Sequence, residues 1–100
     1  MIETVARVPT SRAATYVMGF CRHWPDRLEI DFRERQGVLH FDNAVATLTP
    51  RPNELVVTIL ANDIGTAEQL QVTVSAEINR FANSERPLQF DWQLGRPHAL

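Results

Sequence analysis

Apolar residues that recur every three or four positions predict a helix near the start of the chain. Thr10 or Ser11 can cap its first turn, and Pro25 is expected to end it at about His23. The stripe expected to be buried consists of Ala14, Val17, Met18 and Cys21.

A second stripe of the same spacing predicts a helix over residues 64–82, with Asp63 as its N-cap and Thr66 with Gln69 as an alternative capping box. Its apolar positions are Ala67, Leu70, Val74, Ile78 and Phe81. The "NSERP" segment follows it and is expected to end it. Two amphipathic helices therefore stand far apart in the chain.

Elsewhere apolar and polar residues alternate, which is typical of strands with one dry and one wet face. The run at 54–60 is apolar and β-branched, and this predicts the most buried strand. Gly37 is expected to supply a positive φ in a turn. The other strands are expected over residues 3–8, 28–34, 38–42, 44–49 and 88–94.

The resulting order is β-α-β-β-β-β-α-β, and the short connections between the middle strands favour antiparallel pairing. With both helices on one face of one sheet, this is a two-layer α+β domain, similar to half of a TATA-binding protein in topology. That likeness carries no function. We expect a single domain over residues 1–94 and a tail over 95–100. The opposite face of the sheet is expected to be polar, either wet or against a partner, and to carry Glu29, Asp31, Arg33, Gln89, Asp91 and Gln93.

Charge and composition exclude several functions. The net charge is −2, and the arginines are interleaved with 12 carboxylates, so no nucleic-acid partner is expected. The chain has no lysine, which excludes Schiff-base chemistry and a phosphate-binding P-loop lysine. Its 4 glycines lie too far apart for a glycine-rich phosphate loop.

Cys21 is the only cysteine, which excludes an intrachain disulfide and a thiolate metal cluster. Its place on the buried stripe favours a small core residue over a reactive thiol. The opening residues resemble neither a signal peptide nor an acylation motif, and no apolar run is long enough to cross a bilayer. We therefore expect a cytoplasmic protein without a membrane partner.

The segment "FCRHWPDR" (20–27) gathers the side chains most capable of chemistry. A structural interpretation places His23 against the carbonyls that end the first helix, and Arg80 likewise at the end of the second. The alternative is a small-molecule groove at the same place. Its ligand-binding residues would be His23, Trp24, Arg27, Arg80 and Trp92.

His40 should lie on the wet face, because it alternates with Leu39 and Phe41. Depending on strand order, Asp31 and Asp91 could converge on it and form a metal site or a general base. The other interpretation is a solvated sheet face with cross-strand charge pairs. The candidate metal ligands are His23, His40 and Asp26, but we assign no metal, no cofactor and no catalytic residue.

The segments "FCRHWPDR", "GVLHFDNA", "INRFANSE" and "FDWQL" together resemble the bacterial domain of unknown function 2218 family, over about Glu3 to Leu94. The matching features are Tyr16, His23 followed by Trp24, Gly37 leading to Phe41, Arg80-Phe81-Ala82, and Trp92. Members often have further histidines and a lysine where this chain has Asp26, Arg27 and Glu77. These departures argue against a multi-histidine metal site. The resemblance implies no assigned activity, and an association with iron or siderophore systems.

Two hypotheses of function remain. The first is a non-catalytic binding or accessory module, acting on a protein or small molecule, with iron or siderophore systems as the implied context. It could self-associate through the uncovered sheet face, for example as a homodimer. The alternative is a small-molecule enzyme or a metal-dependent protein with its site near His23 and Arg80.

Overall fold

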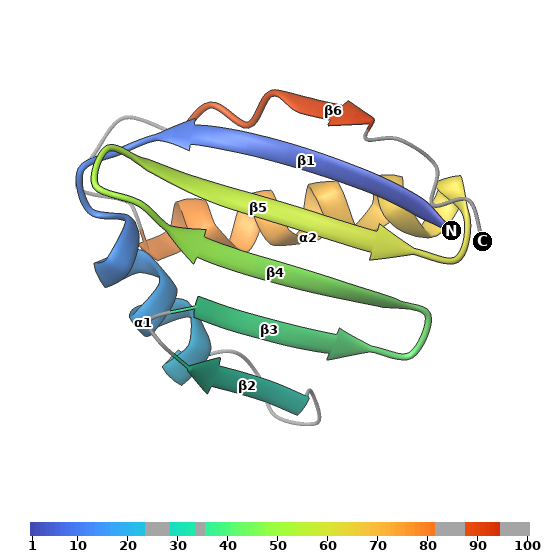
Figure 1. Cartoon of the computed structure of the whole chain (residues 1–100), viewed down its shortest axis with the longest axis horizontal. Helices are drawn as coiled ribbons and strands as arrows, with labels where there is room; N and C mark the ends of the chain where they lie inside the picture. Colours follow the sequence, from blue (N-terminus) through green and yellow to red (C-terminus); the bar gives the residue numbers. More distant parts are fainter. Residues whose placement is uncertain (24–28, 34–35, 82–87, 95–100) are drawn as a thin grey trace.

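The computed structural model describes residues 1–23, 29–33, 36–81 and 88–94, which form one sheet and two helices (Figure 1). The elements in chain order are β1 (Ile2–Pro9), α1 (Ala13–His23), β2 (Glu29–Arg33), β3 (Gln36–Phe41), β4 (Ala44–Pro50), β5 (Glu54–Ala61), α2 (Ile64–Phe81) and β6 (Trp92–Leu94). This order confirms the β-α-β-β-β-β-α-β arrangement expected from the sequence. The tail expected over 95–100 lies outside the described residues.

The sheet has the strand order β2-β3-β4-β5-β1-β6, and each neighbouring pair is antiparallel. Strands β2 to β5 follow one another across the sheet, as short connections require. β1 then pairs with β5 along its whole length, from Ile2 opposite Ala61 to Pro9 opposite Glu54. The first strand of the chain is therefore an interior strand, and the short β6 completes the edge beside it.

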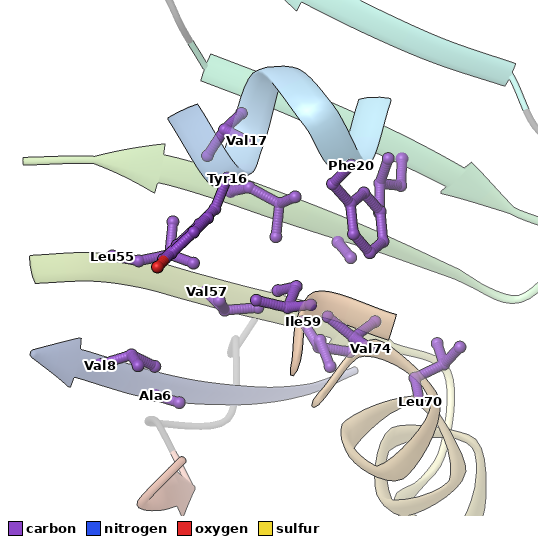
Figure 2. Close-up of a cluster of buried hydrophobic side chains, with 14 of the residues drawn as sticks. Ala6, Val8, Tyr16, Val17, Phe20, Leu55, Val57, Ile59, Leu70 and Val74 are labelled. Carbon is purple, nitrogen blue, oxygen red and sulfur yellow. The ribbon is translucent and has the colours of Figure 1, made fainter. Parts of the chain in front are cut away.

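Both helices cover the same face of the sheet, and the fold is a two-layer α+β domain (Figure 1). α1 packs against β3 and β4, α2 packs against β5 and β1, and the two helices touch each other. Each strand turns alternate residues into this interface; in β5 they are Leu55, Val57, Ile59 and Ala61, all fully buried. Figure 2 shows Leu55, Val57 and Ile59 beside side chains of α1 and α2. Burial of each large aliphatic side chain contributes about 1.5–3 kcal/mol.

The face of α1 that is buried differs from the expected one. Met18 is 43% exposed, and Ala14 and Cys21 are only partly covered. The residues that fill the core are Ala13, Tyr16, Val17 and Phe20. Both sets have helical spacing, but the second contains two aromatic rings, which remove far more apolar area from water. The helix is therefore rotated by about one residue from the expectation.

Gly37 also has a different role from the expected one. It lies within β3, where it pairs with Phe32 on one side and Leu48 on the other, rather than in a turn. A Cβ atom at this position would lie 2.6 Å from Cys21 Sγ and 3.4 Å from Val17 Cγ1. The glycine therefore allows α1 to approach the sheet closely.

The last strand is shorter than its alternating pattern predicts. Only Trp92–Leu94 pair with β1, and Leu94 is 66% exposed at the end of the pairing. Leu88 is buried, but its backbone N–H donates to Asn79 Oδ1 at 2.7 Å instead of to a strand. A side chain of α2 thus replaces the ladder hydrogen bond there.

Polar contacts fix α2 at its N-terminus and in its middle. Asp63 Oδ1 accepts the backbone N–H of Thr66 at 2.8 Å, which confirms the expected N-cap. In the interface, the hydroxyl of fully buried Thr4 accepts a hydrogen bond from Gln71 Nε2 at 2.7 Å and donates to the Gln93 carbonyl. Because a buried hydroxyl is costly without partners, this network holds α2 in register with β1 and β6.

Candidate functional site

The residues predicted to form a groove are only partly described. Trp24, Asp26 and Arg27 lie outside the described residues, as does the side chain of His23, whose backbone ends α1. His98 also lies outside them. The predicted site at the end of α1 therefore stays a prediction.

Arg80 and Trp92, the other two predicted groove residues, have partners within the fold. Arg80 is at the end of α2, is mostly exposed, and donates to the Glu77 carboxylate one turn earlier at 3.3 Å. Trp92 Nε1 donates to Ser75 Oγ at 3.2 Å, and its ring stacks on Phe90 at 5.9 Å between centroids. Trp92 therefore meets α2 more than one turn before Arg80, and each side chain has a structural role.

His40 and Asp31 come together as a pair. His40 Nε2 lies 3.0 Å from Asp31 Oδ2, across the β2–β3 ladder, on the face that the helices leave uncovered. Asp91 does not join them, because it precedes β6 at the opposite edge, beyond β4, β5 and β1. The strand order therefore excludes the three-residue convergence, and the pair of His40 and Asp31 agrees with the other interpretation, a cross-strand pair on the sheet face. Among the residues that the structure describes, no group of three or more histidine, cysteine or acidic side chains could hold a metal.

Cys21 is only partly buried, but it packs against the core. Partial burial raises the pKa of its thiol, which favours the protonated, weakly nucleophilic form. The thiol borders a cavity of about 270 Å³ that Met18, Arg22 and Ile30 also line. The arrangement supports a packing role for the thiol.

The uncovered side of the sheet differs most from what the sequence predicts. Its charged residues lie at the periphery, and these include exposed Asp31 and Asp91, with polar Gln93 beside them as expected; the side chains of Glu29 and Arg33 lie outside the described residues. Its centre carries no charge. Eight uncharged residues on β1, β3, β4 and β5, which we call the open face, alternate with the buried positions: Val5, Val38, Val45, Thr47, Thr49, Val56, Thr58 and Leu60.

Strand pairing arranges the open face in rows that cross the sheet. The middle row places Val38, Thr47, Thr58 and Val5 side by side on adjacent strands. Each of the eight side chains is half-buried by its neighbours alone. The composition of residues 55–60 contained the signal, since Val56, Thr58 and Leu60 are as apolar or β-branched as the buried set. A strand without charged residues on either face is typical of one that is covered on both sides.

Ionisable residues surround this centre at both ends of the strands. Arg7 donates to Glu54 at 2.9 Å, and Arg51 lies 3.9 Å from the same carboxylate. Glu3 is at the other end of β1, and Asp42 is exposed in the turn after β3. Beside Arg7, a shallow cavity of about 220 Å³ is lined by Val5, Arg7, Asp91 and Gln93. The surface has an uncharged centre of valine, leucine and threonine side chains with a charged rim.

The fold and this surface define a small two-layer α+β protein with one uncovered sheet face. Residues 5–93 match the model of a family described as an uncharacterized protein conserved in bacteria (DUF2218). The chain belongs to this family, as its sequence motifs predict.

A solved structure shares the fold of this chain. The NMR structure of PA4090 from Pseudomonas aeruginosa is similar, with a TM-score of 0.80 and 26% sequence identity. The match covers 93% of this chain and 96% of that one, so the two share the whole fold. A search of curated proteins finds no match. None of the described helices is long and apolar enough to cross a membrane.

Proposed function

We propose that the protein is a non-catalytic binding module that contacts a partner protein through the open face. The observation that carries this proposal is the uncharged centre on four adjacent strands, left uncovered by both helices. Contiguous apolar surface with a polar rim is typical of protein interaction sites. The centres of such interfaces are depleted in charged residues, as this centre is.

The described titratable groups support a role without catalysis. Several of them pair with one another on the surface, such as His40 with Asp31 and Arg80 with Glu77. Catalysis by a general base needs a group within hydrogen-bond reach of a nucleophile or substrate pocket. His40 and Asp31 instead lie exposed on a flat sheet edge, which suits a rim contact better than an active site.

The small-molecule alternative at His23 and Arg80 has less support. Its two described members, Arg80 and Trp92, are engaged by Glu77 and Ser75. The association with iron or siderophore systems stays a prediction, because it follows from the family resemblance alone. Titration of the purified protein with a ferric siderophore, followed by tryptophan fluorescence, would test it independently of the open face.

Site-specific photo-cross-linking tests the proposed function. A benzophenone amino acid replaces Thr58 at the centre of the open face, and in a control variant it replaces Val72, which is 71% exposed on α2. Both variants are expressed at native level in the bacterium and illuminated, and the adducts are mapped by mass spectrometry. We expect a discrete protein adduct from position 58 and none from position 72. Equal labelling at both positions, or none at position 58, contradicts the proposal.

A further inference from the structure

We infer that the partner of the open face is a second copy of this chain, bound face to face about a two-fold axis that crosses the strands. This inference rests on the proposed function and adds the identity and orientation of the partner. It follows from the shape, the extent and the charge arrangement of the surface.

The shape of the open face matches another copy of itself. Its middle row consists of β-branched side chains of nearly equal height, Val38, Thr47, Thr58 and Val5. Two such layers fit the spacing of about 10 Å at which sheets pack face to face. An isologous interface requires self-complementary surface, and an uncharged row of similar side chains provides it.

The extent of the surface is close to what a stable dimer needs. Six strands at about 4.8 Å spacing and about 3.4 Å per residue give a flat area of roughly 500–700 Å² before side-chain relief is counted. Specific interfaces bury about 800 Å² of accessible surface on each partner. The whole uncovered side, including its rim, is therefore needed, and this favours a broad partner such as another sheet over a peptide.

Charge decides the orientation. Glu3 and Asp42 lie at one end of the strands, whereas Arg7 and Arg51 lie at the other, where both contact the carboxylate of Glu54 and leave a net positive charge. Arg7 is about 14 Å from Glu3 along β1. A two-fold axis across the strands, through the middle row, places each β1 against the partner's β1 in the opposite direction. The Glu3 end of one copy then meets the Arg7 end of the other. An axis along the strands would bring the two acidic ends together, which is unfavourable.

The first test is sedimentation equilibrium of the purified full chain from micromolar to millimolar concentration. We expect a monomer–dimer equilibrium, with Thr58→Arg weakening dimerisation at least about a hundredfold, because it inserts two charges into the dry centre. The matched control Val72→Arg adds the same charge to the helix layer and should leave dimerisation unchanged. Circular dichroism confirms that both variants fold. A monomeric wild-type chain, or a dimer insensitive to Thr58→Arg, overturns the inference.

The second test concerns the orientation. Glu3→Arg and Arg7→Glu should each weaken their own homodimer about three- to tenfold, since like charges then meet at two symmetric places. Mixing the two variants should restore dimerisation. In the mixed dimer the new arginine of Glu3→Arg faces the new glutamate of Arg7→Glu, and the unchanged Arg7 faces the unchanged Glu3, so opposite charges meet at both places. If the mixture is no tighter than the separate variants, the axis across the strands is wrong.

The results separate this inference from the proposed function. A discrete adduct between position 58 and a different protein, with a monomeric purified chain, overturns the second copy as partner and leaves the binding surface intact. Absence of any adduct and of any dimer overturns both.

Discussion

The Sγ atom of Cys21 in α1 lies directly over Gly37 of β3, where a Cβ atom would be only 2.6 Å from it. Thiol and glycine are thus two halves of one helix–sheet contact. Gly37→Ala should destabilise the fold by about 1–3 kcal/mol, because α1 must move outward or Cys21 must change rotamer. Chemical denaturation measures this loss.

The same contact supplies its own control. Cys21→Ala removes the sulfur, so adding Gly37→Ala to that background should cost much less than in the wild type, with Val17 as the remaining neighbour. Equal costs in both backgrounds would show that the sulfur does not fill this space.

The rotation of α1 leads to a second prediction. Phe20 is fully buried, whereas Met18 is 43% exposed, although the sequence pattern favoured the methionine. Phe20→Ala should therefore lower the free energy of unfolding by about 3–5 kcal/mol. Met18→Ala should change it by only about 0.5 kcal/mol. Urea denaturation of the two variants measures both losses. Similar losses in the free energy of unfolding would contradict this prediction and favour the face of α1 that contains Met18.

The N-cap of α2 makes stability depend on pH. The backbone N–H of Thr66, together with its hydroxyl, holds the pKa of Asp63 below its ordinary value of 3.8. Ionised Asp63 therefore stabilises the folded chain above the unfolded pKa, and this contribution is lost as pH falls through the lower folded pKa.

Thermal unfolding of Asp63→Ala across this acid range tests the cap. At neutral pH the variant should melt below the wild type, and the two melting temperatures should converge in strong acid. Asp63→Asn is the control, because asparagine caps a helix without ionising and should remain close to the wild type at neutral pH. A constant difference between wild type and Asp63→Ala at all pH values would exclude a contribution from ionisation.

Local patterns were sufficient for much of this fold. The start of α2, its Asp63 cap and the burial of β5 depend on residues close in sequence, and the structure confirms them. The choice between the Met18 and Phe20 faces of α1 depended on which area the sheet could cover. That is a property of the assembled layers, and spacing alone does not contain it.

The candidate site was harder to predict, because strand order decides it. His40 meets Asp31 through the neighbouring strand, but Asp91 is on the far edge since β1 inserts between β5 and β6. Likewise Val56 and Thr58 become the centre of a surface only when β1 and β4 flank β5. Pairwise alternation predicted the uncovered face, whereas its apolar centre depended on long-range pairing.

The most direct test of dimerisation through the open face is methyl NMR in the presence of a soluble paramagnetic relaxation agent. In dilute solution the methyl groups of Val45, Val56 and Leu60 should relax strongly, while those of Val57 and Ile59, which the helices cover, should be protected. As protein concentration rises, Val45, Val56 and Leu60 should become protected, and exposed Val72 should not. Open-face methyl groups that stay as accessible as Val72 at every concentration would contradict the account.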